Sequence, residues 1–353
     1  MMSQKIKAIT FIGINHVEVR DYELGACGPT DIVVRTHYTM VSSGTELRVL
    51  GGLYGAKEKY PVIPGYSVVG EVVAVGPEAK GFRVGDLISG RNPRPVPGVA
   101  SMWGGQASHH VYTTQGEDRP VLLPAGANPL DYIVAEISAI SLRGVLAAAP
   151  KAGETAVVLG QGLIGAFSGA WLQAAGCRVI VADREPARLE RSKAWGVAAT
   201  VNVSEPDAEA RIQTLCNGGA DIVVESSGSV AGAMMAYQLI RKKPQAYGAD
   251  YKVEPIVFYH QDWARLVMQA NYLDKVTIDP FGFIPGEGVI ILAPKDRGVE
   301  DRQRAVEAFR RGTLRAGDFI KKPVSFKEAP SAYAALRDDQ KNNFSLAFDW
   351  TGE

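Results

Sequence analysis

This sequence of 353 residues has few cysteines, no excess of charge of either sign and no long apolar run. Its three cysteines, Cys27, Cys177 and Cys216, form no C-x-x-C pair, which argues against a disulfide framework and a cysteine-rich metal site. The 38 basic and 38 acidic residues balance, so we expect no nucleic-acid and no membrane partner. No run of about 18 apolar residues is present. Residues 1–7 carry no apolar signal-peptide core, so we expect a cytoplasmic location.

An apolar stretch that runs directly into a glycine-rich turn is the strongest motif in the chain. Residues 157–159 are Val-Val-Leu, and a G-x-G-x-x-G pattern follows. In such a pattern the glycines allow a tight turn, close approach of a pyrophosphate and packing of the next helix, whose N-terminal N–H groups face the phosphates. An amphipathic stretch, 166–175, supplies that helix. The motif predicts a dinucleotide site at Gly160, Gly162, Leu163, Ile164 and Gly165.

The next apolar strand ends where a dinucleotide fold needs a carboxylate. Asp183 follows residues 179–182, and at this position a carboxylate accepts hydrogen bonds from the adenosine ribose. A carboxylate repels a 2′-phosphate, which favours NAD over NADP, although Arg184 next to it could hold that phosphate. The segment Ser226, Ser227 and Gly228 follows a later strand at the same sheet edge, so we expect it beside the NAD.

The order of the predicted elements changes after the first third of the chain. Strands separated by Gly and Pro are expected first, at 6–13, 31–40, 67–75 and 108–113. Strands that alternate with helices follow, at 156–159, 179–182, 199–203, 221–225, 266–269 and 289–293. We therefore expect an α/β protein with a β-rich domain at 1–135, a doubly wound parallel-sheet domain at 136–298, and a segment at 299–353 that contains a helix and returns to the first domain.

An aromatic segment interrupts the second domain. Residues 242–262 separate a predicted helix from its next strand, and aromatic side chains are dense there. One interpretation is a lid or one wall of a substrate pocket, and the other is a packed surface elaboration or a subunit contact. The aromatic and histidine residues of the segment and its border are Tyr247, Tyr251, Phe258, Tyr259, His260 and Trp263.

Several short motifs in this order resemble the medium-chain dehydrogenase/reductase superfamily, in which a GroES-like domain precedes a Rossmann domain. The pieces that carry the resemblance are Ser43-Gly44-Thr45-Glu46, Pro64-Gly65-Tyr66-Ser67, Val69-Gly70-Glu71-Val72, Val84-Gly85-Asp86, Gly104-Gly105, Glu136, the glycine motif and Asp183. Ser-x-Gly-Thr-Glu with a later Pro-Gly-Tyr is similar to a zinc-free branch that includes bacteriochlorophyllide dehydrogenases and two-domain sugar oxidoreductases. The resemblance implies oxidation of an alcohol to a ketone with NAD, or the reverse.

Two principal zinc-ligand positions of the superfamily hold other residues here. Zinc-dependent members carry Cys where this chain has Ser43 and His where it has Tyr66. Zinc prefers thiolate, imidazole and carboxylate ligands. Glu136 resembles a carboxylate near the metal in polyol dehydrogenases, but one carboxylate cannot hold zinc tightly. The four-cysteine lobe of the structural zinc is missing too, because 89–111 contains no cysteine. We therefore expect no metal.

Without zinc, side chains must take the hydroxyl proton and stabilise the developing alkoxide. Glu136 is the first choice of general base, since its family position points towards the metal site. Tyr66 is expected to orient the substrate by donating a hydrogen bond, because an unperturbed phenol pKa near ~10 is too high for a good base. Thr45 falls where relatives carry a hydroxyl that relays the proton, and Ser43 lies beside it.

Further side chains are candidates for substrate binding. Arg48 could bind an anionic group or be a solvated surface residue. Trp103 could line an apolar pocket or belong to the core. His109 and His110 lie on a predicted strand, so at most one can face the pocket, and a hydrogen-bonded structural histidine is the commoner outcome. For Glu46 we favour a structural or ion-pair role.

The sequence leaves three functions open. The first is an NAD-dependent, zinc-independent dehydrogenase for a secondary hydroxyl of a sugar, cyclitol or other polyfunctional ring. The second is an enzyme that retains NAD and oxidises its substrate transiently for epimerisation or elimination. The third is a non-catalytic NAD(H)-binding sensor. Relatives often dimerise through the nucleotide domain, so we expect a homodimer or homotetramer, with the apolar strand at 289–292 as the candidate contact.

Overall fold

The computed structural model describes residues 4–241, 263–277, 288–294, 298–317, 319–320, 322–339 and 345–352. The predicted aromatic insertion at 242–262 lies outside the described residues, so neither interpretation of it is tested. The chain divides into two compact units, one formed by 1–139 with 297–353 and the other by 140–296. No described helix combines the length and the apolar character that crossing a membrane requires. Each unit is described by itself below.

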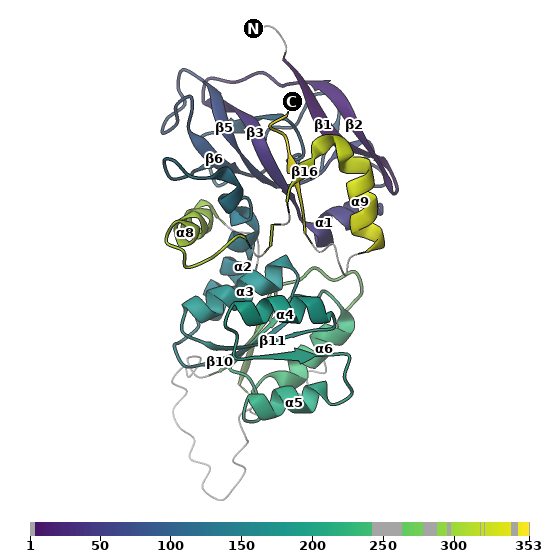
Figure 1. Ribbon diagram of the computed structural model, residues 1–353, viewed down its shortest axis with the longest axis vertical. Helices are drawn as coiled ribbons and strands as arrows, with labels where there is room; N and C mark the ends of the chain where they lie inside the picture. The colour runs from purple at the N-terminus through teal and green to yellow at the C-terminus, as the bar shows by residue number, and fades with distance from the viewer. Residues whose placement is uncertain are drawn as a thin grey trace, which may run out of the picture. The chain divides into compact units, whose positions relative to one another are not determined.

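The first unit is built on two sheets (Figure 1). Their strands are β1 (Lys5–Gly13), β2 (His16–Glu23), β3 (Asp31–Val41), β4 (Val62–Ile63), β5 (Ser67–Val75), β6 (Leu87–Gly90), β7 (Ala100–Ser101), β8 (His109–Thr113), β9 (Val121–Leu122), β16 (Val324–Ser325) and β17 (Leu346–Asp349). One sheet has the order β2-β1-β4-β7, and the other has the order β16-β17-β3-β5-β6-β9 with β8 paired to β3. The antiparallel pairing of β17 with β3 shows that the tail returns to this unit.

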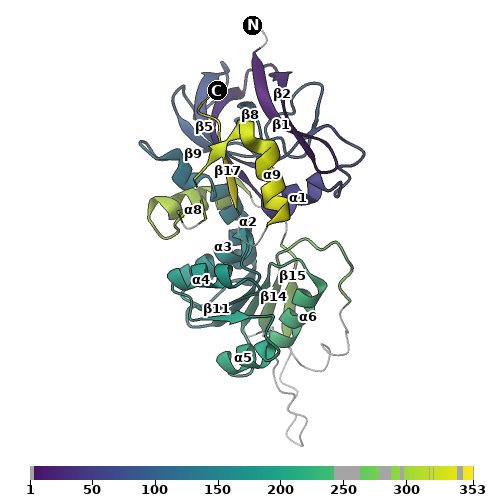
Figure 2. The ribbon, with the colours of Figure 1, turned by 45° about the vertical axis from the view of Figure 1, so that its right-hand side comes forward.

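Helices close the core of the first unit. They are α1 (Ser43–Leu50), α8 (Val299–Arg310), α9 (Ala329–Asp338) and the first residues of α2 (Ala135–Ala148), with short 3-10 turns at Pro129–Tyr132 and Phe326–Glu328. Tyr333 of α9 packs edge-on against Phe11 of β1. The tail therefore supplies part of the core, and both views show α9 beside β1 and β2 (Figures 1 and 2).

The second unit is a parallel sheet covered on both faces. Its strands are β10 (Thr155–Leu159), β11 (Arg178–Asp183), β12 (Ala199–Asn202), β13 (Ile222–Glu225), β14 (Ala264–Met268) and β15 (Val289–Leu292), in the order β12-β11-β10-β13-β14-β15. Its helices are the rest of α2, α3 (Leu163–Ala174), α4 (Pro186–Ala194), α5 (Ala208–Leu215) and α6 (Val230–Leu239). Figure 2 shows α6 beside β14.

Alternate residues of each central strand serve opposite faces of this sheet. Val157 packs with α5 and α6, whereas Val158 packs with α2, α3 and α4. A strand buried on both faces requires a continuous apolar run, which is why β10 reads Thr-Ala-Val-Val-Leu without polar alternation. The predicted α/β class, with a β-rich unit and a doubly wound parallel sheet, is confirmed.

Helix α1 was not predicted. It begins at Ser43 inside the first short motif and runs for 8 residues, with Ser42 as its N-cap residue. Ser, Gly and Thr at its start are weak helix formers. Its helical state comes instead from packing, since Val49 and Leu50 are buried in the same cluster as Tyr333. Tertiary contacts of this kind cannot be read from local propensity.

Candidate functional site: a dinucleotide turn and a buried hydroxyl cluster

The glycine motif joins β10 to α3, as the sequence predicts. Gly160 has φ +86°, and a Cβ there would meet the Ser227 nitrogen at 2.7 Å. A Cβ on Gly165 would overlap the carbonyl oxygen of Gly160. Gly162 differs, because a Cβ there would meet nothing within 4 Å. The first and third glycines are required by the fold, and the second faces open space at the N-terminus of α3, as pyrophosphate binding requires.

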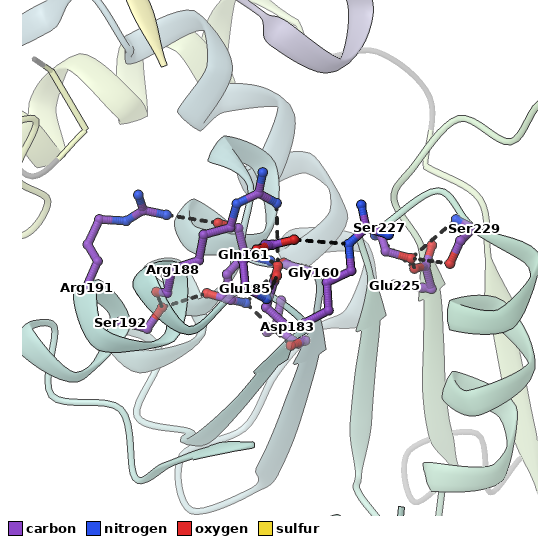
Figure 3. Close-up of polar contacts among 12 residues, drawn as sticks. Gly160, Gln161, Asp183, Glu185, Arg188, Arg191, Ser192, Glu225, Ser227 and Ser229 are labelled. Carbon is purple, nitrogen blue, oxygen red and sulfur yellow. Dashed lines mark hydrogen bonds and ion pairs between the residues drawn. The ribbon is translucent and has the colours of Figure 1, made fainter. Parts of the chain in front are cut away.

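Asp183 holds the residue in the middle of this turn (Figure 3). The Gln161 N–H donates to Asp183 Oδ2 at 2.6 Å, and Arg191 donates to the Gln161 carbonyl at 2.9 Å. Asp183 Oδ1 accepts from the Glu185 N–H at 2.8 Å, and Arg188 lies 3.7 Å from Oδ2. The carboxylate is buried at the predicted sheet edge, where it anchors the turn and keeps negative charge beside it.

Arg184, by contrast, forms its ion pair with Glu185. Its side chain is exposed and lies 3.5 Å from Glu185. The cations nearest the turn are Arg188 and Arg191 (Figure 3), which the sequence interpretation did not select. They lie three residues apart on α4, about one helical turn, so the helix period after Asp183 was the signal that could have found them.

A buried glutamate organises the predicted serine-rich turn after β13. Glu225 accepts hydrogen bonds from the Ser227 N–H at 2.8 Å and the Gly228 N–H at 3.3 Å, and also from the hydroxyls of Ser227 and Tyr272. Ser229 then caps α6 by accepting from the Gly232 N–H. Figure 3 shows Ser229 beside Ser227 and Glu225. The sequence interpretation missed Glu225, although a carboxylate at the end of an apolar strand was the available signal.

Three hydroxyls form a chain in the first unit. The Tyr66 hydroxyl donates to Ser42 Oγ at 2.5 Å, and Ser42 Oγ lies 3.4 Å from Thr45 Oγ1, to which it donates. Tyr66 and Thr45, both predicted site residues, are thus linked through Ser42. Ser43 is the first residue of α1, next to this chain in sequence. Ser42 was missed because the family-like motif begins one residue later.

Glu46 is bonded to Ser42 and is fully buried. It accepts from the Ser42 N–H at 2.9 Å, the Tyr333 hydroxyl at 2.6 Å and Gln106 Nε2 at 3.2 Å. Burial raises the pKa of Glu46 to about 7, although the three donors oppose that rise. Gln106 also accepts from Thr39, which itself accepts from Trp350. The favoured structural role of Glu46 agrees with this network, which ties α1 to the tail of the chain.

Glu136 lies in the first turn of α2 and is buried. Its Oε1 accepts from Arg302 Nη1 of α8 at 3.2 Å. Arg302 is 1% exposed and also donates to the carbonyls of Glu117 and Arg119, at 2.6 Å each. The structure thus pairs the predicted general base with a buried cation. Its catalytic role stays a prediction.

The four residues considered for substrate binding lie in different surroundings. Trp103 packs edge-on against Tyr66, with ring centroids 5.6 Å apart. Arg48 donates to the Tyr54 hydroxyl at 2.9 Å. His109 and His110 line a hollow of about 260 Å³ with Arg94, to which Tyr66 contributes nothing. Burial lowers the pKa of His110 to about 3, so this imidazole is neutral and unsuited to acid–base work near pH 7.

The donor set of the first unit does not fit zinc. Within the described parts of the chain, no three His, Cys, Asp or Glu side chains are grouped to hold a metal ion. Ser43 and Tyr66 occupy the positions expected for two ligands, and hydroxyls are poor zinc ligands. The second unit, by contrast, fits a nicotinamide dinucleotide at the open Gly162 edge of its turn.

Comparisons with known proteins find matches to both units of the chain. A family model described as "Alcohol dehydrogenase GroES-like domain" matches residues 28–116, and one described as "Zinc-binding dehydrogenase" matches 164–246. A sorbitol dehydrogenase of Halalkalibacterium halodurans is 26% identical over 252 residues, which cover 66% of this chain and 73% of the relative. An L-threonine 3-dehydrogenase of Yersinia pestis is 30% identical over 236 residues, which cover 62% and 68%.

The fold also matches solved structures. A Sinorhizobium meliloti 1021 protein, described as a zinc-binding dehydrogenase and bound to NADP, has a TM-score of 0.76 and 22% identity. The match covers 94% of this chain and 96% of that one. The relatives' names include zinc-binding dehydrogenases, whereas this chain carries hydroxyls at two of the expected ligand positions.

Proposed function

Because this chain belongs to the medium-chain dehydrogenase/reductase superfamily of alcohol dehydrogenase-like oxidoreductases that use a nicotinamide cofactor, we propose that it oxidises a secondary hydroxyl of a polyol, sugar or cyclitol to a ketone with NAD and without zinc. The observation that carries this proposal is the hydroxyl chain of Tyr66, Ser42 and Thr45. The family resemblance supports it, because it implies that zinc-dependent relatives have a metal ligand at the position of Tyr66. Sorbitol and threonine in the relatives' names support a substrate with more than one polar group.

In this proposal each unit supplies one part of the reaction. A bound nicotinamide cofactor would supply the hydride acceptor. Gly162 and the N-terminus of α3 would hold its pyrophosphate, while Asp183 would accept hydrogen bonds from its ribose. Tyr66 binds the substrate hydroxyl, and its neighbouring hydroxyls carry away the proton. These oriented dipoles take the place of a metal in stabilising the alkoxide.

Tyr66→Phe is expected to lower kcat with sorbitol or another polyol by about a hundredfold, the scale of one positioned acid–base group. The cause is loss of the phenol that contacts the substrate oxygen, while the ring and its contact with Trp103 remain. The measurement is NADH formation at 340 nm with metal-free enzyme, and zinc content is determined by mass spectrometry.

Trp103→Phe is the control, because it alters the same aromatic pair without touching a hydroxyl. Unchanged kcat in Tyr66→Phe contradicts the assignment of Tyr66. Stoichiometric zinc in the active wild-type enzyme contradicts the metal-free mechanism. A panel of polyols, sugars and cyclitols that yields no NADH at all contradicts the proposed reaction.

A preference for NAD over NADP is the second part of the proposal. The carboxylate of Asp183 ends β11 beside the glycine turn, where the motif predicts the ribose. The Sinorhizobium meliloti structure, by contrast, holds NADP. Asp183→Asn keeps an oxygen that can accept from the Gln161 N–H but removes the charge that repels a 2′-phosphate. We expect the ratio of the NADP and NAD dissociation constants to fall about tenfold, equivalent to about 1.4 kcal/mol. Fluorescence titration with NADH and NADPH measures both, and an unchanged ratio contradicts this role.

We also propose a homodimer or homotetramer that forms through β15. This strand lies at the end of the parallel sheet, and Ile291 on it is 42% exposed. An exposed apolar edge strand is a ready site for pairing with a second copy.

A further inference from the structure

The chain of hydroxyls in the first unit has a direction. Tyr66 donates to Ser42, and Ser42 donates to Thr45. The Tyr66 oxygen therefore directs its own proton away along the chain and can accept another through a lone pair. Thr45 is only half-buried, so the chain runs from a buried phenol towards solvent.

The middle hydroxyl is held from its backbone. Ser42 is the N-cap residue of α1, yet its side chain makes no capping hydrogen bond to the helix. Its N–H is bound instead by Glu46, which Tyr333 and Gln106 fix in turn. The side chain of an N-cap serine usually accepts a hydrogen bond from a backbone N–H of the helix. Here the Ser42 Oγ bonds to Tyr66 and Thr45 instead.

We propose that Ser42 completes a proton path from the substrate hydroxyl to solvent, through Tyr66, Ser42 and Thr45, and that Glu46 is the residue that positions Ser42. This inference rests on the proposed dehydrogenase function. The substrate carbon loses a hydride to NAD, and its O–H bond breaks as the proton moves to Tyr66. The Tyr66 proton moves to Ser42, the Ser42 proton to Thr45, and the Thr45 proton to water. Each hydroxyl keeps one proton, and the products are ketone, NADH and one released proton.

Glu46 makes the path sensitive to pH. The groups that contact its carboxyl are the Ser42 N–H from α1, the Tyr333 hydroxyl from α9 and the Gln106 amide. Tyr333 stays protonated because its own pKa is raised well above its usual value by burial and by Glu46. Since the pKa of Glu46 is about 7, its charge beside Ser42 appears as the pH rises through neutrality. A negative charge there opposes withdrawal of the proton from Tyr66, because a like charge disfavours the phenolate.

The first test needs no substrate. The ionisation of Tyr66 is isolated by ultraviolet difference titration. The wild type is compared with Tyr66→Phe, and Ser42→Ala is compared with the double variant that carries Ser42→Ala and Tyr66→Phe. We expect Ser42→Ala to raise the pKa of Tyr66 by about one unit, the scale of one hydrogen bond to a phenolate. Ser42→Thr keeps the hydroxyl and serves as the matched control. An unchanged Tyr66 pKa in Ser42→Ala overturns the path, whether or not any substrate is turned over.

The second test follows turnover with a polyol that the wild type oxidises. Ser42→Ala is expected to lower kcat about tenfold, with KM and the NAD dissociation constant unchanged, and to reduce the solvent deuterium isotope effect. Ser42→Thr is expected to restore both. Glu46→Gln is expected to remove the inflection near pH 7 from the kcat profile. Wild-type kcat and isotope effect in Ser42→Ala overturn the path. A wild type that is inactive with every polyol contradicts the proposed dehydrogenase function. The Tyr66 titration still shows in that case whether Ser42 is hydrogen-bonded to Tyr66.

Discussion

Gly162→Ala is expected to weaken binding of NADH at least tenfold while the protein remains as stable as the wild type. Gly162 has φ −68° and ψ −173°, an extended conformation that alanine adopts without strain. A Cβ there meets no atom within 4 Å, so the fold has room for it. The same space is what a pyrophosphate needs to approach the backbone at the start of α3. Isothermal calorimetry with NADH and thermal unfolding of the apoprotein measure the two effects separately.

Gly165→Ala provides the matched contrast. Its Cβ would overlap the Gly160 carbonyl and lie 3.3 Å from Ser226 Cβ, so backbone must move. We expect a loss of about 3 kcal/mol in the free energy of unfolding, at the upper end for overpacking, together with loss of NADH binding. Equal destabilisation by the two substitutions contradicts the division of the glycines into one that contacts the cofactor and one required by the fold. Unchanged NADH affinity in Gly162→Ala contradicts the placement of the pyrophosphate.

The sequence predicts the parallel sheet well because its signals are local. Strand β10 is an apolar run, and Gly160 and Gly165 after it lie where a Cβ would meet backbone atoms. Strand β5 was predicted with its observed bounds, Ser67–Val75, since β-branched residues fill it between Gly and Pro. The two-residue strands β4 and β7 were not predicted, because strands this short are defined by their partners and not by a sequence period.

The candidate site could be predicted only in part. Asp183 and Tyr66 follow from motif spacing, but a motif does not state what a side chain binds. Glu46 is three residues from Ser43 in sequence, yet its partner Tyr333 is 287 residues away. Contacts between residues so far apart in sequence depend on the complete fold. The sequence therefore did not predict the hydrogen bonds that join Glu46 to Ser42, Tyr333 and Gln106.

Glu136→Gln is expected to lower the free energy of unfolding by about 3 kcal/mol, because it leaves a buried cation without its counter-charge. Arg302 is 1% exposed, and Glu136 is its carboxylate partner at 3.2 Å. The carbonyls of Glu117 and Arg119 satisfy part of the guanidinium but carry no full negative charge. Urea unfolding of the single variants Glu136→Gln and Arg302→Met, and of the double variant, measures the coupling. We expect the double variant to be more stable than the sum of the two single losses predicts.

The same variants separate a structural role of Glu136 from a catalytic one. If Glu136 is the general base, Glu136→Gln loses turnover under conditions in which it is fully folded, whereas Arg302→Met keeps a carboxylate and retains turnover. If the pair is structural, both variants lose turnover only in proportion to their unfolded fraction. The first result contradicts the proposal that Tyr66 accepts the proton. The second result supports that proposal, since the Tyr66 hydroxyl leads through Ser42 to Thr45. The buried pair of Arg302 and Glu136 then takes no part in the reaction, and the hydroxyl chain alone must stabilise the alkoxide.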